Sequence, residues 1–108
     1  MTVAQLTEKL GLTVFCMPEE ERQVTGGYVG DLLSWVMGRA ECGEAWITIM
    51  SNQNVAAVAA LSDVSCVVLT ENVQPDPDLL KKAQAQGINL LGSDKSSFSM
   101  AVELSKLL

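Results

Sequence analysis

The sequence predicts a single α/β domain over residues 1–108, a three-layer α/β/α sandwich built on a mostly parallel sheet of about four to five strands. Two observations predict this class. Short apolar runs with β-branched members recur at 12–17, 44–50, 64–70 and 88–91, as is typical of buried strands. Segments with helical apolar spacing separate these runs, and strands that alternate with helices favour a parallel sheet between helical layers.

The chain opens with a predicted helix over 3–10. Thr2 has the side chain of an N-cap, and Gly11 is suited to end the helix. The first strand, 12–17, is a continuous apolar run that Pro18 stops. A charged loop follows, and we expect it to be solvated.

The stretch 24–37 is the one around which we expect the rest of the chain to be organised. It reads as a glycine turn, with Gly26 and Gly27, followed at once by an amphipathic helix to about Ala40. Thr25 is placed to cap that helix. One apolar stripe is predicted on it, formed by Val29, Leu32, Leu33, Val36, Met37 and Ala40.

The middle of the chain contains two further strands around an alanine-rich helix. The strand 44–50 has apolar side chains on both faces, which predicts a strand covered on both sides. The helix 55–61 ends at Asp63. The strand 64–70 is the most apolar of all, so we place it at the centre of the sheet.

The last third supplies the final strand, 88–91, between two helices. Asp76, Pro77 and Asp78 open the first helix, and Gly87 closes it. The closing helix of the chain is amphipathic, with Phe98, Ala101, Val102 and Leu104 among its expected inner residues.

Composition excludes several classes of function. Thirteen acidic and seven basic residues give a formal net charge of −6, which opposes binding to nucleic acid. The chain has no histidine, the commonest acid–base catalyst and metal ligand, and we expect no metal and no cofactor. Its apolar runs are shorter than the roughly 18 residues of a membrane helix, and its first residues lack the pattern of a signal peptide. We therefore expect a cytoplasmic protein with no membrane partner.

The three cysteines do not form a metal-binding or redox motif. Cys16 and Cys66 lie in apolar runs and are expected to be buried thiols. Cys42 lies in a turn and is expected to be exposed. Because Glu41 and Glu44 surround it with negative charge, a reactive thiolate is disfavoured there.

Small and polar residues follow the predicted strands, where strand-to-helix loops gather at one edge of the sheet. Helix N-termini at this edge favour anions. One interpretation is therefore a ligand-binding edge for a small anionic molecule. Its candidate residues are Thr25, Gly26, Gly27, Asn52, Gln53 and Asn54, with Lys95 as a further contact.

The alternative interpretation is that the same residues serve the fold. Ser51, Thr25, Asp76 and Ser93 can be ordinary helix caps, and the glycines can serve tight turns. Every α/β fold needs such caps, so the sequence leaves both interpretations open.

A second stripe on the predicted central helix contains Tyr28, Asp31, Trp35 and Arg39. These residues are three or four positions apart, and Trp35 can stack with Arg39. Tyr28, Asp31 and Trp35 are the candidates for an interface with a second subunit or a partner enzyme. Packing of Trp35 beneath a neighbouring element is the alternative, whereas Trp46 is expected in the core.

The segments 22–37, 46–49 and 53–59 together resemble the DRTGG domain family. Related domains form the N-terminal part of HPr kinase/phosphorylase, occur in some long phosphotransacetylases, and lie between CBS domains in regulatory regions of some pyrophosphatases. The resemblance covers nearly the whole chain and implies a three-layer α/β fold and a regulatory or assembly module that often forms dimers. The family's motif begins with Asp-Arg, and Glu21 and Arg22 stand near that place here.

The leading hypothesis is a non-catalytic regulatory or accessory module, a homodimer that binds a small anionic metabolite or nucleotide at the loop edge. The alternative is a pure protein–protein interaction or dimerisation module for a partner enzyme, with no ligand of its own. An enzyme is the third class. Its candidate groups, Asp31, Glu71, Asp94 and Lys95, follow no pattern that would bring them together, so we expect no catalytic residues.

Overall fold

The computed structural model describes all of residues 1–108. Five strands form one sheet in the order β1-β5-β4-β3-β2. β2 to β5 are parallel, and β1 pairs antiparallel with β5. The elements are α1 (Val3–Leu10), β1 (Thr13–Cys16), β2 (Gly26–Val29), α2 (Leu33–Arg39), β3 (Glu44–Thr48), α3 (Asn54–Ser62), β4 (Cys66–Leu69), α4 (Pro77–Gln86), β5 (Leu90–Gly92) and α5 (Ser97–Leu107).

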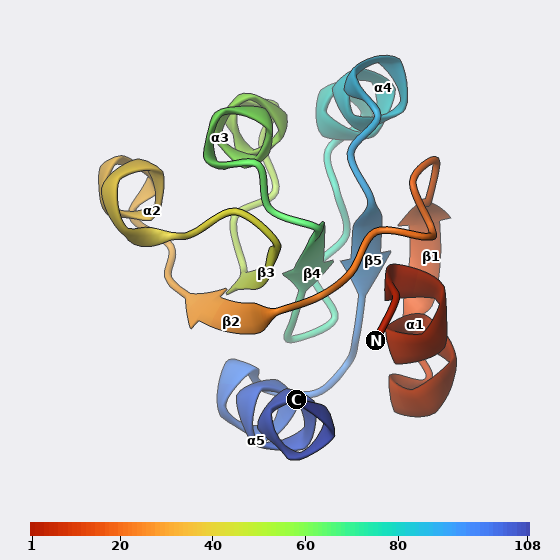
Figure 1. The fold of residues 1–108 in the computed structure, drawn as a ribbon. Helices are drawn as coiled ribbons and strands as arrows, with labels where there is room; N and C mark the ends of the chain where they lie inside the picture. Colours follow the sequence, from red (N-terminus) through yellow and green to blue (C-terminus); the bar gives the residue numbers. More distant parts are fainter.

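The helices cover both faces of the sheet, which confirms the three-layer α/β/α class. Figure 1 shows α2, α3 and α4 above the sheet and α1 and α5 below it. Each face has its own buried apolar cluster, of 13 residues on the side of α2, α3 and α4 and of 11 on the side of α1 and α5. All four residues of β4 are buried, as predicted for the central strand. None of the five helices has the length and hydropathy needed to cross a membrane.

The parallel strands follow one another in space as they do in sequence, from β2 at one edge to β5. Their order therefore never reverses, and the sheet has no switch point between parallel strands where a ligand would ordinarily bind. The reversal comes instead at β5, where β1 is added in the opposite direction.

The predicted glycine turn is wrong: residues 26–29 form the edge strand β2. Gly26 pairs with Glu44 of β3, and Val29 pairs with Ile47. This pairing uses backbone groups, so it does not require the side chains that ordinarily signal a strand. Thr25 precedes a strand and does not cap a helix, which also contradicts the prediction.

The central helix is shorter than predicted, because it begins at Leu33 and ends at Arg39. Of its predicted apolar stripe, only Val36 is buried, and Leu33 and Ala40 are partly buried. Val29, Leu32 and Met37 are at least half exposed. Helical spacing overestimated the helix because it counted residues of β2 and of the β2–α2 connection.

Several local capping signals gave correct helix ends, but Ser51 and Ser93 are not caps, because the N-cap residues of α3 and α5 are Gln53 and Ser96. Thr2 and Gln5 form a capping box at α1, and Gly11 ends the helix in the left-handed region, at φ 62°. Pro77 stands in the first turn of α4, and Gly87 ends it at φ 72°. Asp63 ends α3.

The inner face of α5 is rotated from the predicted one. Met100 and Leu104 are buried, with Ala101 and Leu107 packed beside them. Phe98 is 79% exposed and Val102 is 38% exposed, so these two predicted inner residues face outward. The spacing 100, 104 and 107 is the stripe that contacts the sheet.

Candidate functional site

A pocket of about 310 Å³ lies where the carboxyl ends of β4 and β5 meet the amino end of β1. Because β1 is antiparallel, Thr13 lies opposite Gly92 at the end of β5. The turn after α1 therefore comes beside the loops that follow β4 and β5. The polar side chains that line the pocket are Thr13, Asn72, Gln74, Ser93, Asp94 and Lys95.

Backbone hydrogen bonds hold the two loops of this pocket together. Glu71 N–H donates to the carbonyl oxygen of Lys95 at 2.8 Å, and Asn72 N–H donates to that of Ser93 at 3.0 Å. Glu71 and Asn72 both have left-handed backbone angles, φ 57° and 59°. Such angles cost about 1–2 kcal/mol in residues other than glycine, and they persist here because the bonds to the second loop hold the turn. The pocket wall is thus formed before any ligand arrives.

Three apolar residues also line the pocket, Leu10, Phe15 and Val73. A Cβ atom on Gly92 would come within 2.5 Å of Cε2 of Phe15, so the ring can lie across β5 only because position 92 has no side chain. The accessible lining is mostly polar, so the pocket suits a polar molecule that forms hydrogen bonds with its amide and hydroxyl groups.

The charged groups of the pocket are Asp94 and Lys95, whose formal charges cancel. Lys95 forms an ion pair with Glu103 of α5, and its side chain is 40% exposed. Ion pairs that are this exposed contribute only about 0–1 kcal/mol. An anionic ligand could therefore draw Lys95 away from Glu103 at little cost.

Asn52, Gln53 and Asn54 lie at the same edge of the sheet but after β3, outside this pocket. The Asn52 side-chain oxygen accepts a hydrogen bond from Asn54 N–H at 2.9 Å. This side chain therefore bonds to the backbone at the start of α3, where Gln53 is the N-cap residue and forms no side-chain cap bond. Gln53 and Asn54 are exposed. Binding of a ligand by these three amides stays a prediction.

Thr25, Gly26 and Gly27 lie at the opposite end of the sheet, where β2 begins. The structure therefore does not bring the six predicted ligand residues together. Gly27 has a packing role instead, because a Cβ atom there would lie 2.9 Å from Cδ2 of Leu104 in α5. Thr25 contacts Gly43, whose φ of 86° and small size leave room for the threonine side chain.

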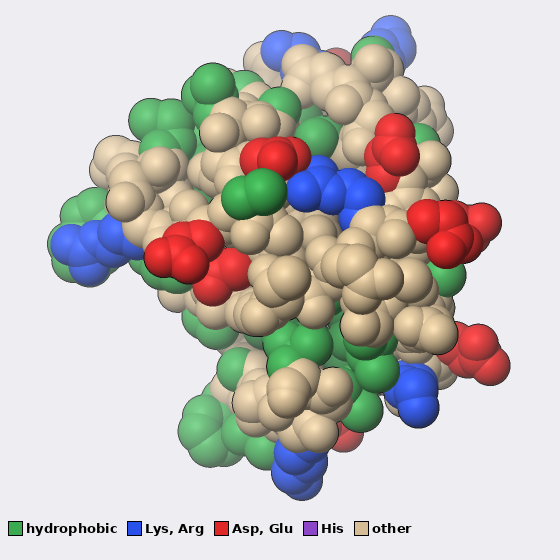
Figure 2. All heavy atoms as spheres, in the orientation of Figure 1, with side chains coloured by type: hydrophobic (Ala, Val, Ile, Leu, Met, Phe, Trp, Pro, Cys, Tyr) green, Lys and Arg blue, Asp and Glu red, His purple; other side chains and the backbone are tan.

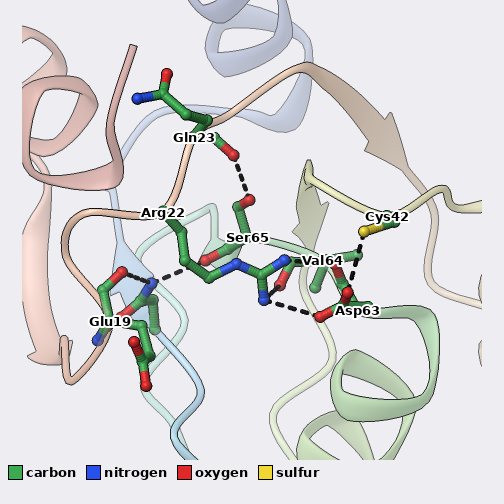
Figure 3. A network of polar contacts seen from close by, with 8 residues as sticks. Glu19, Arg22, Gln23, Cys42, Asp63, Val64 and Ser65 are labelled. Atoms are coloured by element: carbon green, nitrogen blue, oxygen red, sulfur yellow. Dashed lines mark hydrogen bonds and ion pairs between the residues drawn. The ribbon is translucent and has the colours of Figure 1, made fainter.

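The residues just before β2 form a polar network at the amino ends of the strands (Figure 3). Arg22 donates to the Asp63 carboxylate at 3.0 Å and to the carbonyl oxygens of Asp63 and Val64 at 2.9 and 3.1 Å. These carbonyls lie at the carboxyl end of α3, where a positive charge is favoured. Arg22 therefore serves as the cap of a helix, a role that the sequence did not reveal.

Cys42 completes this network, and its thiol donates to the second oxygen of Asp63 at 3.0 Å. That hydrogen bond, with the positive charge of Arg22, lowers the pKa of the Asp63 carboxyl. The same hydrogen bond is the main cause of the raised pKa of the Cys42 thiol. Cys42 is exposed, as predicted, but is held as a thiol and not as a reactive thiolate.

The other two cysteines are also held as thiols. Cys66 is buried, as predicted, and burial raises its pKa to about 12. Cys16 is only partly buried, and burial raises its pKa as well. No group of three or more Cys, Asp and Glu side chains is arranged to hold a metal ion.

Asn89 fastens the segment before β2 to the sheet, and sequence reasoning missed it. This side chain is 2% exposed. Its amide donates to the carbonyl oxygens of Glu19 and Ser65, both at 2.8 Å, and its oxygen accepts from Glu19 N–H at 2.9 Å. Ser65 donates in turn to the Gln23 carbonyl oxygen. The available signal was an asparagine within an apolar run, since a buried amide must find partners.

The three predicted interface residues have different environments. Trp35 is 52% exposed, and the Arg39 guanidinium lies 3.8 Å from the centre of its ring, which confirms the predicted stacking. Tyr28 is partly buried against the cluster beneath α2. Asp31 accepts hydrogen bonds from the Thr48 hydroxyl and Ile49 N–H, at 2.8 and 2.9 Å, and so joins β2 to β3. Trp46 is fully buried, as predicted.

Comparison with known proteins identifies the family. The profile of the DRTGG domain matches residues 5–107, whereas no curated protein matches the chain. The fold is similar to the CBS and DRTGG domains of the regulatory region of Clostridium perfringens pyrophosphatase, solved in complex with the activator diadenosine tetraphosphate. The TM-score is 0.77 at 16% identity, over 94% of this chain and 44% of that one, so this chain spans less than half of its neighbour's length. The chain belongs to the DRTGG domain family.

Proposed function

We propose that this chain is a non-catalytic regulatory or accessory module, dimeric and associated with a partner enzyme, that binds a small anionic metabolite or nucleotide. The observation that carries this proposal is the pocket at the ends of β4, β5 and β1, which two bonded loops hold open. It combines amide and hydroxyl groups with Lys95. These are suitable contacts for the polar groups and one phosphate of a small anionic ligand.

Two further findings support the proposal. The neighbouring pyrophosphatase region is regulatory, and its activator is a dinucleotide. The groups that an enzyme would need are dispersed or engaged in this chain. Asp31 bonds to Thr48 and Ile49 and contacts no candidate nucleophile.

A thermal-shift screen followed by calorimetry tests the proposal. The panel contains mononucleotides, diadenosine tetraphosphate, acyl phosphates, carboxylates and inorganic phosphate. A ligand at about a hundredfold over its dissociation constant adds about 2.7 kcal/mol of stability. That is a shift of roughly 10 °C or more in a domain of this size.

Three variants locate the site. Asn72→Gly removes the amide without straining a left-handed position, and Lys95→Met removes the cation; both are expected to weaken binding about tenfold or more. Gln53→Ala is the matched control, an exposed amide outside the pocket. Loss of binding in Gln53→Ala alone would move the site to the amides after β3. No shift with any compound would contradict ligand binding.

The second candidate is an interaction module without a ligand. Its support is the exposure of large apolar side chains on two helices, Trp35 in α2 at 52% and Phe98 in α5 at 79%. Exposed aromatic side chains of this kind are common anchors for protein partners. A negative ligand screen together with a partner that Trp35→Ala or Phe98→Ala releases would favour this candidate.

A further inference from the structure

The outer edge of β2, a strand of four residues, has no strand beside it. β2 and β1 are the two edge strands of the sheet. Proteins blunt such edges with charges, prolines or bulges. β1 has a register irregularity between Val14 and Cys16 and is followed by Pro18. β2 has no irregularity, and residues 25–30 contain no charged residue and no proline.

An apolar groove of about 300 Å³ runs beside this edge, between β2 and α5. Gly27 has no side chain to fill this groove, so the groove stays open along the strand. Val29 has its side chain on the same face and is 50% exposed. The groove is lined by Gly26, Gly27, Val29, Ile47, Leu104 and Leu108.

This edge is complementary to itself in one antiparallel register. Thr25 N–H bonds to Gly43 beside β3, and since successive residues of a strand bond to opposite sides, Gly26 and Tyr28 present their backbone groups to the open side. If two strands pair about a twofold axis at Tyr28, each Tyr28 faces its copy. Directly opposed residues share a face of the sheet, so Val29 of each copy then lies over Gly27 and the groove of the other.

Apolar surface continues on both sides of the strand. A stable protein interface typically buries about 800 Å² of surface on each subunit. Leu32 and Trp35 are 58% and 52% exposed, and Ile49 and Leu108 are 44% and 48% exposed. Figure 2 shows hydrophobic side chains at the upper left, over α2, and at the lower left, beside α5. Residues 25–30 have no charged side chain in a chain of net charge −6, and the Glu44 carboxylate that flanks the strand lies beside Gly26, two residues from the axis at Tyr28.

We propose that two copies of this chain associate by antiparallel pairing of their β2 strands, with Val29 of each copy in the groove of the other. The inference rests on the dimeric part of the proposed function and names its surface. The sheet becomes continuous through both subunits, with the backbone groups of each Tyr28 paired to those of its copy. The interface is isologous, as a closed dimer requires.

Sedimentation equilibrium of three proteins tests the inference. Val29→Lys places a charge in the groove twice per dimer and is expected to raise the dimer dissociation constant about 100-fold. Val14→Lys is the matched control, a valine of 47% exposure on the other edge strand, and should change that constant by no more than about threefold. Circular dichroism establishes that both variants are folded.

Amide hydrogen exchange of the unmodified chain gives a readout that needs no variant. Exchange at Tyr28 should slow as the concentration rises through the dimer dissociation constant, while exchange at Val14 should not change. A monomer at all concentrations would overturn both this inference and the dimeric part of the proposed function. A dimer that Val29→Lys leaves intact, or that Val14→Lys disrupts equally, would overturn the β2 surface alone. The ligand screen is independent of either outcome.

Discussion

Replacing Asn89 by alanine should destabilise the fold strongly, although this residue lies far from the proposed ligand pocket. Its side chain makes three hydrogen bonds, to Glu19 N–H and to the carbonyl oxygens of Glu19 and Ser65. Each is worth about 1 kcal/mol, and buried partners left without a bond cost more. We expect a loss of about 3–4 kcal/mol, a large part of the 5–15 kcal/mol that stabilises a typical domain.

Urea unfolding followed by circular dichroism measures this loss. Asn54→Ala is the matched control, because Asn54 is an exposed asparagine whose side chain forms no hydrogen bond within the chain. Its effect should stay within about 0.5 kcal/mol. Asn89→Asp is a second variant of nearly the same size. It keeps the acceptor for Glu19 N–H but turns the donor into a second acceptor that faces two carbonyl oxygens.

Asn89→Asp should therefore be destabilised at neutral pH and should recover partly on acidification, when its carboxyl gains a proton to donate. Asn89→Ala within about 1 kcal/mol of the unmodified protein would refute the reasoning. So would an equal loss in Asn54→Ala. Either result would mean that the segment before β2 is held by other contacts.

Three further predictions follow from the same structure. Arg22→Ala removes the cation that caps α3 and should lower the unfolding free energy by about 1–2 kcal/mol in urea titrations; an unchanged unfolding free energy would contradict the capping role. Gly92→Ala should lower the unfolding free energy by about 1–3 kcal/mol, because its Cβ would meet Phe15. Gly38→Ala is the control in the same assay: it has open space around it in α2 and should be neutral or stabilising by up to about 1 kcal/mol. Equal effects of the two substitutions would refute the close approach of Phe15 to Gly92. The pKa of Cys66 is raised by burial to about 12 from 9.0, so between those pH values the unfolded chain loses its proton first and stability should fall as pH rises. Cys66→Ala should flatten the pH dependence of the unfolding free energy in that window, and an unchanged pH dependence would contradict the burial of a protonated thiol.

Much of the fold could be predicted because its signals are local. The caps at Thr2 and Gly11 and at Pro77 and Gly87 define helix ends through the bonding of neighbouring residues. The uniformly apolar run of β4 predicted the central strand of the sheet. The match of the DRTGG profile to residues 5–107 agrees with the family resemblance of the central segment.

Of the candidate site, the sequence predicted the edge but not the residues. It indicated polar loops after the strands, and Lys95 does line the pocket there. It also placed Thr25, Gly26 and Gly27 in that edge. That placement failed because a glycine pair has no side-chain pattern to distinguish a turn from a strand, and β2 is defined by its backbone bonds to β3.

By itself, then, the sequence determined the fold class, the ends of α1 and α4, the central strand and the family, because each has its signal in residues close together in the chain. Tertiary structure alone decided the direction of β1, the pocket between Thr13 and Ser93, and the roles of Arg22 and Asn89. These features join residues some 40 to 80 positions apart. Pairing over such distances depends on how the layers pack, which no local pattern encodes.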